Sequence, residues 1–267
     1  MILRLQTLGT ASAMPVSDRN PSAQVLSVQG RLFLIDCGEG TQQQMRRAHL
    51  SFLKTEAIFI SHTHGDHIFG LPGLLNTMTM YGRTGKLDIY GPADLGDYLD
   101  FCRSHFGAGE GYELVFHPLS GDAPAVVHTS RHITVTAFPL EHKIPAWGYR
   151  FDETVTPRHR QENPAYVAKS YAYCSDTRPF AALPDYIRGV NTLFHEATYP
   201  DSMADKAADR YHSTTRQAAA CALAAGAGRL IVGHYSSRIT DYDAYIAECR
   251  EIFPETVAAG DLDVFEI

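Results

Sequence analysis

Four side chains able to bind a metal lie within six consecutive positions, in the segment His62-Thr63-His64-Gly65-Asp66-His67. The apolar run Ala57–Ile60 leads into this segment as a predicted strand, and an apolar helical pattern follows it. Side chains two apart in an extended chain project to the same side. The first two histidines are therefore expected to hold one ion, while the aspartate and the last histidine reach a second. The alternative is a histidine-rich surface loop, which would need no partners elsewhere in the chain.

Three further residues of ligand type each follow a strand-like run: His142, Asp176 and His234. Strand ends are where rigid scaffolds present functional side chains. Taken singly, each has an ordinary explanation, because a histidine after a strand is often a loop or core residue and Ser175–Thr177 could be a turn or a helix N-cap. Together with the histidine-rich segment, they complete two coordination spheres and favour a two-metal hydrolytic site.

The length and composition of the chain set broader limits. At 267 residues, it is expected to fold as a single domain, residues 1–267, with a large core. The net charge of −7 argues against general affinity for nucleic acid, so an enzyme acting on RNA would need a local basic patch. Candidates are Arg46–Arg47 and Arg158–Arg160, unless these are simply solvated surface charges.

The sequence also indicates a cellular environment. No apolar run approaches the roughly 20 residues that cross a bilayer, so a cytoplasmic location and no membrane contact are expected. The five cysteines are scattered and include no CxxC pair, so we expect reduced core residues rather than disulfides or a thiolate zinc site.

Hydrophobic periodicity predicts a mixed α/β protein. Strands are expected at residues 2–8, 23–29, 31–36, 57–60, 87–90, 112–118, 131–138, 146–151, 170–174, 191–195, 229–233 and 261–266. Helices are expected at residues 38–48, 67–80, 93–106, 179–188, 213–226 and 241–251. Two sheet-plus-helix halves, meeting around residues 145–170, suggest a layered sandwich with helices outside. The irregular stretch Asp152–Lys169 is expected to be a loop or short excursion.

The order HxHxDH, then His, Asp and His, resembles the metallo-β-lactamase superfamily, and within it the short form of tRNase Z (ribonuclease Z). Supporting motifs run from the first strand to about residue 240: Leu8-Gly9-Thr10 with Pro15 and Arg19-Asn20; Asp36–Gln42; Gly148–Arg150; Ser175–Thr177; His195–Thr198; His212–Thr214; and Gly233–Arg238. The resemblance implies a four-layer αββα sandwich, two zinc ions per chain, a homodimer, and endonucleolytic removal of 3′ trailers from precursor tRNA.

The resemblance also implies a set of metal ligands. Carried over by motif, the first zinc would be held by His62, His64 and His142, the second by Asp66, His67 and His234, and Asp176 would bridge both. Two cations sharing a carboxylate can share a water, lower its pKa and clamp the oxygens of an in-line phosphoryl transition state, so that a hydroxide between the ions attacks the phosphorus. Manganese or iron would tolerate the same ligands.

Two more residues match a hydrogen-bonded pair that the family places beside the scissile phosphate: His212 and Glu196. The histidine could protonate the departing 3′ oxygen or stabilise charge on the phosphoryl oxygens, while the carboxylate holds its tautomer. In the family, Asp66 also orients the attacking water or accepts its proton. From the sequence alone, His212 could equally be a helix-entry residue before a Ser213/Thr214 cap. Gly38–Gly40 is expected to form a tight strand-to-helix turn rather than a phosphate loop.

The chain departs from the family at one place. Short tRNase Z enzymes usually carry a long, flexible, basic arm that grips the tRNA elbow, whereas only Phe151–Cys174 separates Arg150 from Ser175 here. The arm is expected to be truncated or missing. RNA affinity would then rest on nearer cations: Arg19, Arg46, Arg178 and Arg238. The alternatives are an arm-less hydrolase of small phosphodiesters or another substrate, and a non-catalytic, metal-stabilised binding protein.

Overall fold

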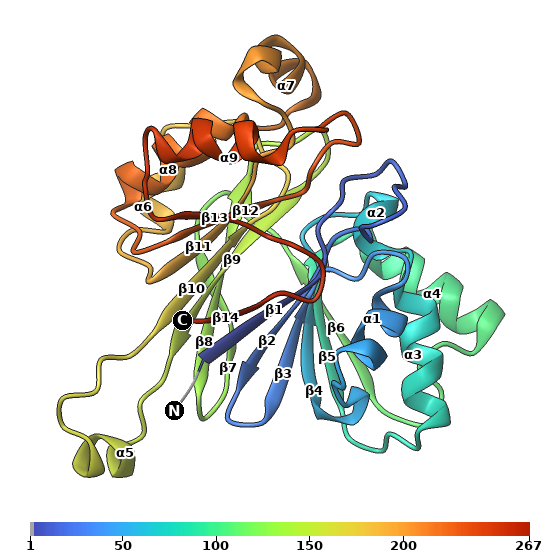
Figure 1. Ribbon diagram of the computed structural model, residues 1–267. Helices are drawn as coiled ribbons and strands as arrows, with labels where there is room; N and C mark the ends of the chain where they lie inside the picture. The colour runs from blue at the N-terminus through green and yellow to red at the C-terminus, as the bar shows by residue number, and fades with distance from the viewer. Residues whose placement is uncertain (1–2) are drawn as a thin grey trace.

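The computed structural model describes residues 3–267, and a seven-stranded mixed sheet forms its first half (Figure 1). Its strands are β1 (Leu3–Gly9), β2 (Ala23–Val28), β3 (Arg31–Ile35), β4 (Thr55–Phe59), β5 (Leu87–Pro92), β6 (Leu114–Leu119) and β14 (Val264–Glu266). They lie in the order β14-β1-β2-β3-β4-β5-β6. The pairs from β14 to β3 are antiparallel and those from β3 to β6 are parallel.

The second sheet also has seven strands and is also divided into a parallel and an antiparallel part. Its strands are β7 (Ala125–Thr129), β8 (Ile133–Leu140), β9 (Ala146–Glu153), β10 (Ser170–Cys174), β11 (Thr192–Glu196), β12 (Leu230–Gly233) and β13 (Thr256–Ala258). They lie in the order β13-β12-β11-β10-β9-β8-β7, parallel from β13 to β10 and antiparallel from β10 to β7. Because β8 and β10 both run antiparallel to β9, their C-terminal ends lie at the same edge of the sheet.

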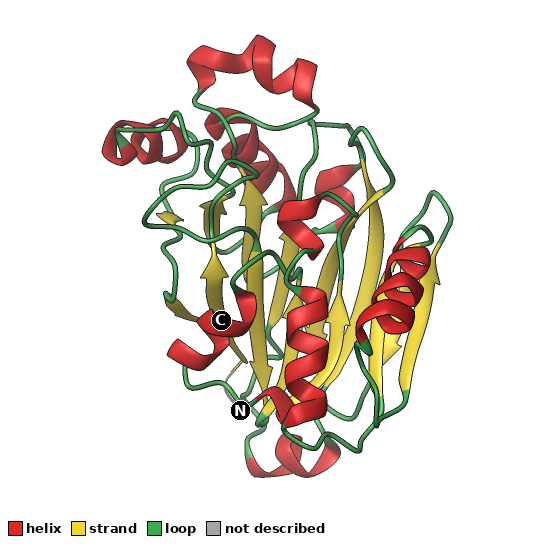
Figure 2. Cartoon of the chain, turned by 90° about the vertical axis from the view of Figure 1, so that its right-hand side faces the viewer, coloured by secondary structure: helices red, strands yellow, loops and turns green. Residues whose placement is uncertain are grey.

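Helices cover the outer face of each sheet, as parallel strands require crossover connections. The first sheet is covered by α1 (Thr41–Arg47), α3 (Leu71–Met80) and α4 (Leu95–Phe106), which face the viewer in Figure 2. The second is covered by α6 (Leu183–Tyr186), α8 (Thr215–Ala225) and α9 (Tyr242–Arg250). The remaining short helices are η1 (Phe52–Lys54), α2 (Gly65–Ile68), α5 (Pro157–Glu162), η2 (Asp201–Met203) and α7 (Ala204–Arg210). No helix of the described chain is long and apolar enough to span a membrane.

A buried aromatic core joins the two sheets. Phe59 of the first sheet contacts Tyr149 and Phe151 of the second, with ring centroids 5.3 Å apart in each pair. Burying one such side chain contributes roughly 1.5–3 kcal/mol to stability. With apolar clusters also between each sheet and its helices, the molecule has four layers, and the expected αββα arrangement is confirmed.

The expected boundary between the halves, at residues 145–170, is wrong. The chain crosses between the sheets in residues 120–124, and β14 returns to the first sheet at the end. Periodicity predicted β8 and β9 as strands but could not assign them to a sheet, because pairing depends on partners distant in sequence. The strands β7 and β13 and the helix α7 were not predicted. Few of their side chains are buried, so their hydrophobic pattern is weak.

The segment Thr154–Lys169 projects from the second sheet between β9 and β10, with α5 at its tip (Figure 1). It was correctly expected to be a loop or short excursion, and it stands where a truncated or missing arm was expected. Its base is anchored by the buried carboxylate of Glu153, which accepts hydrogen bonds from the Tyr166 hydroxyl at 2.6 Å and the Lys169 amide at 3.1 Å.

Candidate metal centre and catalytic pair

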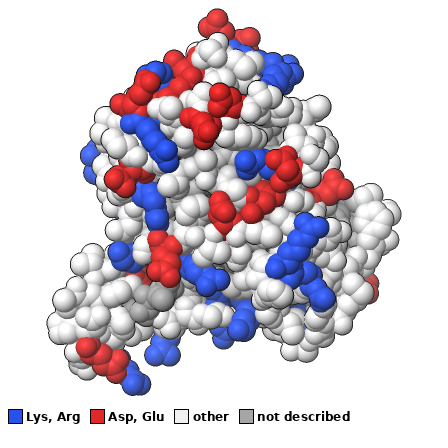
Figure 3. All heavy atoms as spheres, in the orientation of Figure 1, with Lys and Arg blue, Asp and Glu red and all other residues white. Residues whose placement is uncertain are grey.

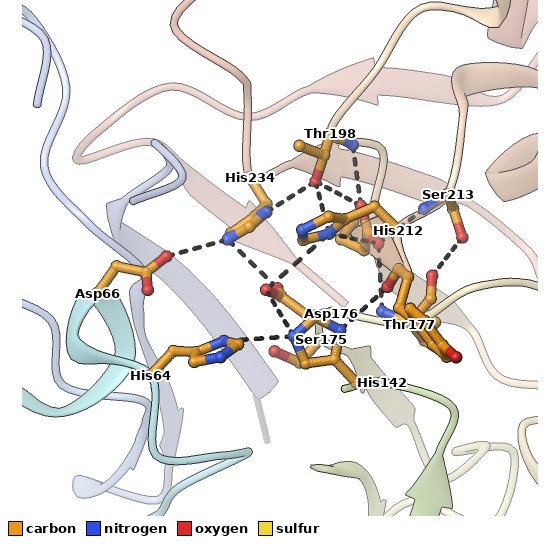
Figure 4. A network of polar contacts seen from close by, with 12 residues as sticks. His64, Asp66, His142, Ser175, Asp176, Thr177, Thr198, His212, Ser213 and His234 are labelled. Carbon is orange, nitrogen blue, oxygen red and sulfur yellow. Dashed lines mark hydrogen bonds and ion pairs between the residues drawn. The ribbon is translucent and has the colours of Figure 1, made fainter. Parts of the chain in front are cut away.

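The histidines and aspartates singled out by their spacing converge at the C-terminal ends of several strands. The segment after β4 carries His62 and His64, and α2 carries Asp66 and His67. The other three follow strands of the second sheet: His142 after β8, Asp176 after β10 and His234 after β12. The site therefore lies between the two halves of the sandwich (Figure 4).

One group of these side chains consists of three histidines and one carboxylate oxygen. Nδ1 of His64 lies 3.0 Å from Nε2 of His62 and 3.2 Å from Nε2 of His142. Oδ2 of Asp176 lies 3.6 Å from Nε2 of His62 and 3.9 Å from that of His142. Four ligands placed tetrahedrally about 2.0–2.1 Å from a zinc ion would be roughly 3.3 Å apart, so these atoms have suitable spacing for one ion.

A second group lies beside the first. Oδ2 of Asp66 is 3.4 Å from Nε2 of both His67 and His234. The other oxygen of Asp176, Oδ1, lies 3.6 Å from Nε2 of His67 and 3.2 Å from Nε2 of His234. The two carboxylate oxygens of Asp176 thus face different groups of histidines.

Two buried atoms support the fit of these residues to a metal. Nε2 of His67 and Oδ1 of Asp176 are both inaccessible to solvent and have no hydrogen-bond partner among the described residues. A buried polar atom without a partner costs free energy, and a cation between these atoms would satisfy both. The cluster could therefore hold metal ions.

The second nitrogen of each inner histidine is held by a neighbour. Asp36 lies 2.8 Å from Nδ1 of His67, Ser61 lies 3.0 Å from Nδ1 of His62, and Thr198 lies 2.8 Å from Nδ1 of His234. The backbone carbonyl of Tyr211 lies 3.0 Å from Nδ1 of His142. Such contacts fix ring orientation and leave Nε2 directed into the site.

Asp36 joins the site to the core, and the sequence did not indicate this role. Its carboxylate accepts hydrogen bonds from the Ser61 amide at 2.7 Å, the Ser61 hydroxyl at 2.9 Å and the Tyr173 hydroxyl at 2.7 Å, besides contacting His67. Its φ of 56° lies in the left-handed region, where a non-glycine residue is strained and these contacts hold it. The signal that could have marked it is its place at the end of a predicted strand and at the start of the quoted motif Asp36–Gln42.

The carboxylates create a field that favours cations. Burial by itself lowers the pKa of His67, but Asp66, Asp36 and Asp176 outweigh that effect and raise it well above the usual value. A field that favours a proton on this ring favours a divalent cation in its place. Burial instead dominates at His62, and together with the neighbouring His67 and His142 it lowers the pKa of that ring well below its usual value.

A histidine–carboxylate pair stands beside the metal ligands. Nδ1 of His212 lies 3.1 Å from Oε1 of Glu196, which is fully buried and also accepts from the Ser213 amide at 2.8 Å. Burial opposes charge on both groups, but their attraction prevails: Glu196 has its pKa lowered to about 2, and Glu196 and Asp176 raise that of His212 to about 9. Thr214 caps α8 two residues later, so the helix-entry role and the pair coexist at this position.

These groups open into a cavity of about 800 Å³ between the halves. Its floor includes Asp176, with His64 and Asp66 on one side and His212 on the other, as Figure 4 shows. All of the candidate ligands and the candidate pair named from the sequence are brought together here. Thr198 joins them and was not assigned a role from the sequence, although it was quoted within a motif; its hydroxyl donates to Glu196 at 2.6 Å.

Comparison with known proteins places this geometry in a family. The β-lactamase superfamily domain matches residues 31–235. Ribonuclease Z of Porphyromonas gingivalis is 35% identical over 290 residues, covering 95% of each chain, and that of Parabacteroides distasonis is 37% identical over 289 residues with the same coverage. The crystal structure of human tRNase Z, short form, superposes with a TM-score of 0.82 at 30% identity and covers 98% of each chain. The chain belongs to the ribonuclease Z family of the β-lactamase superfamily.

Proposed function

We propose that this protein is a metal-dependent endoribonuclease that removes 3′ trailers from precursor tRNA. The observation that carries the proposal is the position of Asp176, whose two oxygens face separate groups of histidines. That arrangement suits two ions held by one carboxylate, and relatives over 95% of the chain bear the name ribonuclease Z. The whole chain, residues 1–267, acts as one hydrolase domain, since one aromatic core joins both sheets.

The ligand assignment follows the two groups of donor atoms. One ion would be held by His62, His64 and His142, the other by Asp66, His67 and His234, and Asp176 would offer one carboxylate oxygen to each. Imidazole and carboxylate donors at tetrahedral spacing favour zinc, with manganese or iron as substitutes. When bound, such ions lower the pKa of water and neutralise charge on the phosphoryl oxygens.

The protein's own side chains move the protons. Asp66 faces the cavity and orients the attacking water or accepts its proton. On the opposite side, Glu196 accepts the Nδ1 proton of His212, which leaves the Nε2 proton of the imidazolium for the departing 3′ oxygen. The pKa of about 9 keeps His212 protonated at neutral pH, in the form that a general acid needs.

Basic side chains on one wall of the cavity provide the contacts to RNA phosphates: Lys143, Lys206, Arg210 and Arg238. The chain is acidic, and lysine and arginine are interspersed with acidic residues on the face shown in Figure 3, so this wall is the local basic patch that the activity needs.

Of the cations expected from the sequence, only Arg238 lines this cavity. Arg19 instead donates to the Ala259 carbonyl at 3.0 Å and stacks on Tyr235 and Tyr242. Arg46 contacts Tyr81 on the outer helical layer, and Arg178 pairs with Glu141 at 2.7 Å. These three side chains are engaged in intramolecular contacts and are not among the residues that line the cavity.

We further propose that the protein acts as a cytoplasmic homodimer. The short arm lies at the end of β10 remote from Asp176, so α5 cannot reach the cavity of its own chain and would meet RNA held by a partner (Figure 1). Sedimentation analysis that gives a monomer at micromolar concentration would exclude the dimer.

The cysteines bear on the proposed cytoplasmic location. All five are free, and four are buried, as expected for reduced core residues.

The short arm also favours a second candidate, a hydrolase of small phosphodiesters. Alignments with the relatives run over 290 residues, more than the 267 of this chain, so the relatives contain segments that it lacks. Loss of remote tRNA contacts would leave the hydrolytic centre intact and widen the range of substrates.

One assay separates these proposals. Purified protein is incubated with a precursor tRNA, the matching mature tRNA and a chromogenic phosphodiester, with and without a chelator, and metal is then restored as zinc, manganese or iron. Trailer release leaving a 3′ hydroxyl on the tRNA, abolished by the chelator and restored by metal, is the expected result. Turnover of the small ester alone supports the second candidate. If no substrate is turned over in a metal-dependent way, the result supports the non-catalytic binding protein.

A further inference from the structure

The two walls of the cavity differ in chemistry. Among the described residues that line it, every lysine and arginine comes from the second half of the chain. The wall from the first half is formed by Ala13–Pro15, Pro21 and Phe69, and its charged residues are the acidic Glu39 and Asp66. A nucleotide has an anionic phosphate and an apolar aromatic base, so an amphipathic cleft of this kind has a suitable wall for each part.

Phe69 is placed so that its ring can stack. It follows α2 directly, three residues after Asp66, and its side chain is 63% exposed. The ring lies across Gly65, where an added Cβ would come within 2.2 Å of it. The backbone of Gly65 therefore supports one side of the ring, and the rest is open to the cavity. Met14 on the same wall is 60% exposed.

The proposed reaction indicates which nucleobase of the substrate would contact the wall from the first half of the chain. The departing 3′ oxygen belongs to the last nucleotide of the mature tRNA and lies beside His212, on the basic wall. The phosphate remains with the trailer, which continues away from that side. A second phosphate is disfavoured near Glu39, whereas an unpaired base gains contact area.

We propose that Phe69, assisted by Met14, forms a stacking platform for the first nucleobase of the single-stranded trailer. The inference rests on the proposed ribonuclease activity and adds a substrate-binding residue to it. Aromatic stacking accepts any base because every base has a π-face, so the platform positions the trailer without selecting its sequence.

The test compares two precursor tRNAs that differ only at the first trailer position, which carries either adenosine or an abasic residue. Wild-type enzyme is expected to give a kcat/KM ratio of roughly 5 to 150 in favour of adenosine, the range for one base stacked on an aromatic ring. Phe69→Ala should bring that ratio close to one, Phe69→Trp should keep it, and Met14→Ala should lower it partly. Because both substrates meet the same protein, partial misfolding cancels from the ratio.

A matched control is Phe106→Ala, which removes an exposed phenylalanine of α4 outside the cavity and should leave the ratio unchanged. A wild-type ratio of one, or a ratio that survives in Phe69→Ala, overturns the platform while leaving the ribonuclease intact. If the wild-type enzyme cuts neither precursor, the proposed function itself fails, and the platform fails with it.

Discussion

At the scale of single residues, Asp176 is the group on which both proposed metal positions depend. Replacing it with alanine removes a ligand from each group of histidines at once. We expect Asp176→Ala to lose most bound metal and all measurable turnover, whereas Asp185→Ala, which removes an exposed carboxylate paired with Arg188, should keep both. Elemental analysis of the purified variants measures this. One metal ion per chain in fully active wild type would contradict the dinuclear centre.

Replacing His212 should lower the rate of catalysis without lowering the metal content, because Nδ1 of this ring is engaged by Glu196. His212→Ala is expected to keep nearly full metal content and to lose about 10²- to 10⁴-fold in rate, the range for general acid–base groups. His117→Ala is the control, since that ring pairs with Asp88 outside the site. Loss of metal in His212→Ala would make this histidine a ligand, and unchanged activity would restore the simple helix-entry role.

Asp36 contacts the candidate metal centre from the core side, through the His67 ring. Asp36→Ala leaves the His67 ring without its 2.8 Å partner, and we expect metal affinity to fall about 10- to 100-fold, as for other outer contacts of metal ligands. Asp88→Asn is a matched control because it alters an aspartate–histidine pair of similar length away from the site. Competition with a chromogenic chelator gives both affinities, and equal values would remove Asp36 from the centre.

The sequence predicted which candidate ligands come together better than it predicted their supports, for a physical reason. Candidate ligands such as His62 and His64 come in spacings that have no packing explanation. Asp36, by contrast, meets Ser61, His67 and Tyr173 only after the two sheets have packed together. A lone aspartate at a strand end has no pattern of its own, so its role emerges from tertiary contacts.

At the scale of elements, the turn after β3 fixes the position of α2. The Gly70 amide donates to the Cys37 carbonyl at 2.8 Å, and a Cβ at Gly70 would lie 2.2 Å from the Gly38 carbonyl oxygen. The predicted tight turn at Gly38–Gly40 is present, with Gly40 at a φ of 82°. The carbonyl of His67 is also bound in this turn, by the Cys37 amide at 2.8 Å, so strand, turn and ligand-bearing helix form one unit.

Gly70→Ala should therefore disturb both stability and the site. Overpacking of this kind costs about 1–3 kcal/mol, and the forced shift of α2 should weaken metal binding as well. Gly85→Ala is the control, because nothing lies within 4 Å of its added Cβ. Urea denaturation of the metal-free proteins measures the first effect and metal titration the second. A Gly70→Ala protein as stable as wild type would show that the turn can relax.

The elements that periodicity missed share one property, weak burial. The helix α7 buries only Ala207, and β7 is mostly exposed, so neither carries the pattern of a core-facing element. Both are nevertheless fixed by neighbours, β7 by pairing with β8 and α7 by η2 and the loops around the cavity. Hydrophobic patterns in a sequence indicate which elements face the core. These two elements bury few side chains, so the pattern did not reveal them.

At the scale of the whole molecule, the candidate metal centre and the short arm are separate parts. The centre is built from strand ends, while the short arm leaves the second sheet at its opposite end (Figure 1). Arg158 at the arm's tip pairs with Glu162 at 2.7 Å, so part of its positive charge is already compensated. Few phosphate contacts remote from the reacting bond are then available, and such contacts supply much of the salt-sensitive affinity for RNA.

This separation predicts a high KM for precursor tRNA together with ordinary turnover of a small phosphodiester. Grafting a longer basic arm between Arg150 and Ser175 should lower the KM for RNA and steepen its dependence on salt, because each added phosphate contact releases counterions. Small-ester turnover is the internal control and should not change, since the graft lies far from Asp176. If the unmodified enzyme already processes precursor tRNA with a submicromolar KM, the basic wall of the cavity supplies the whole grip and the arm contributes little.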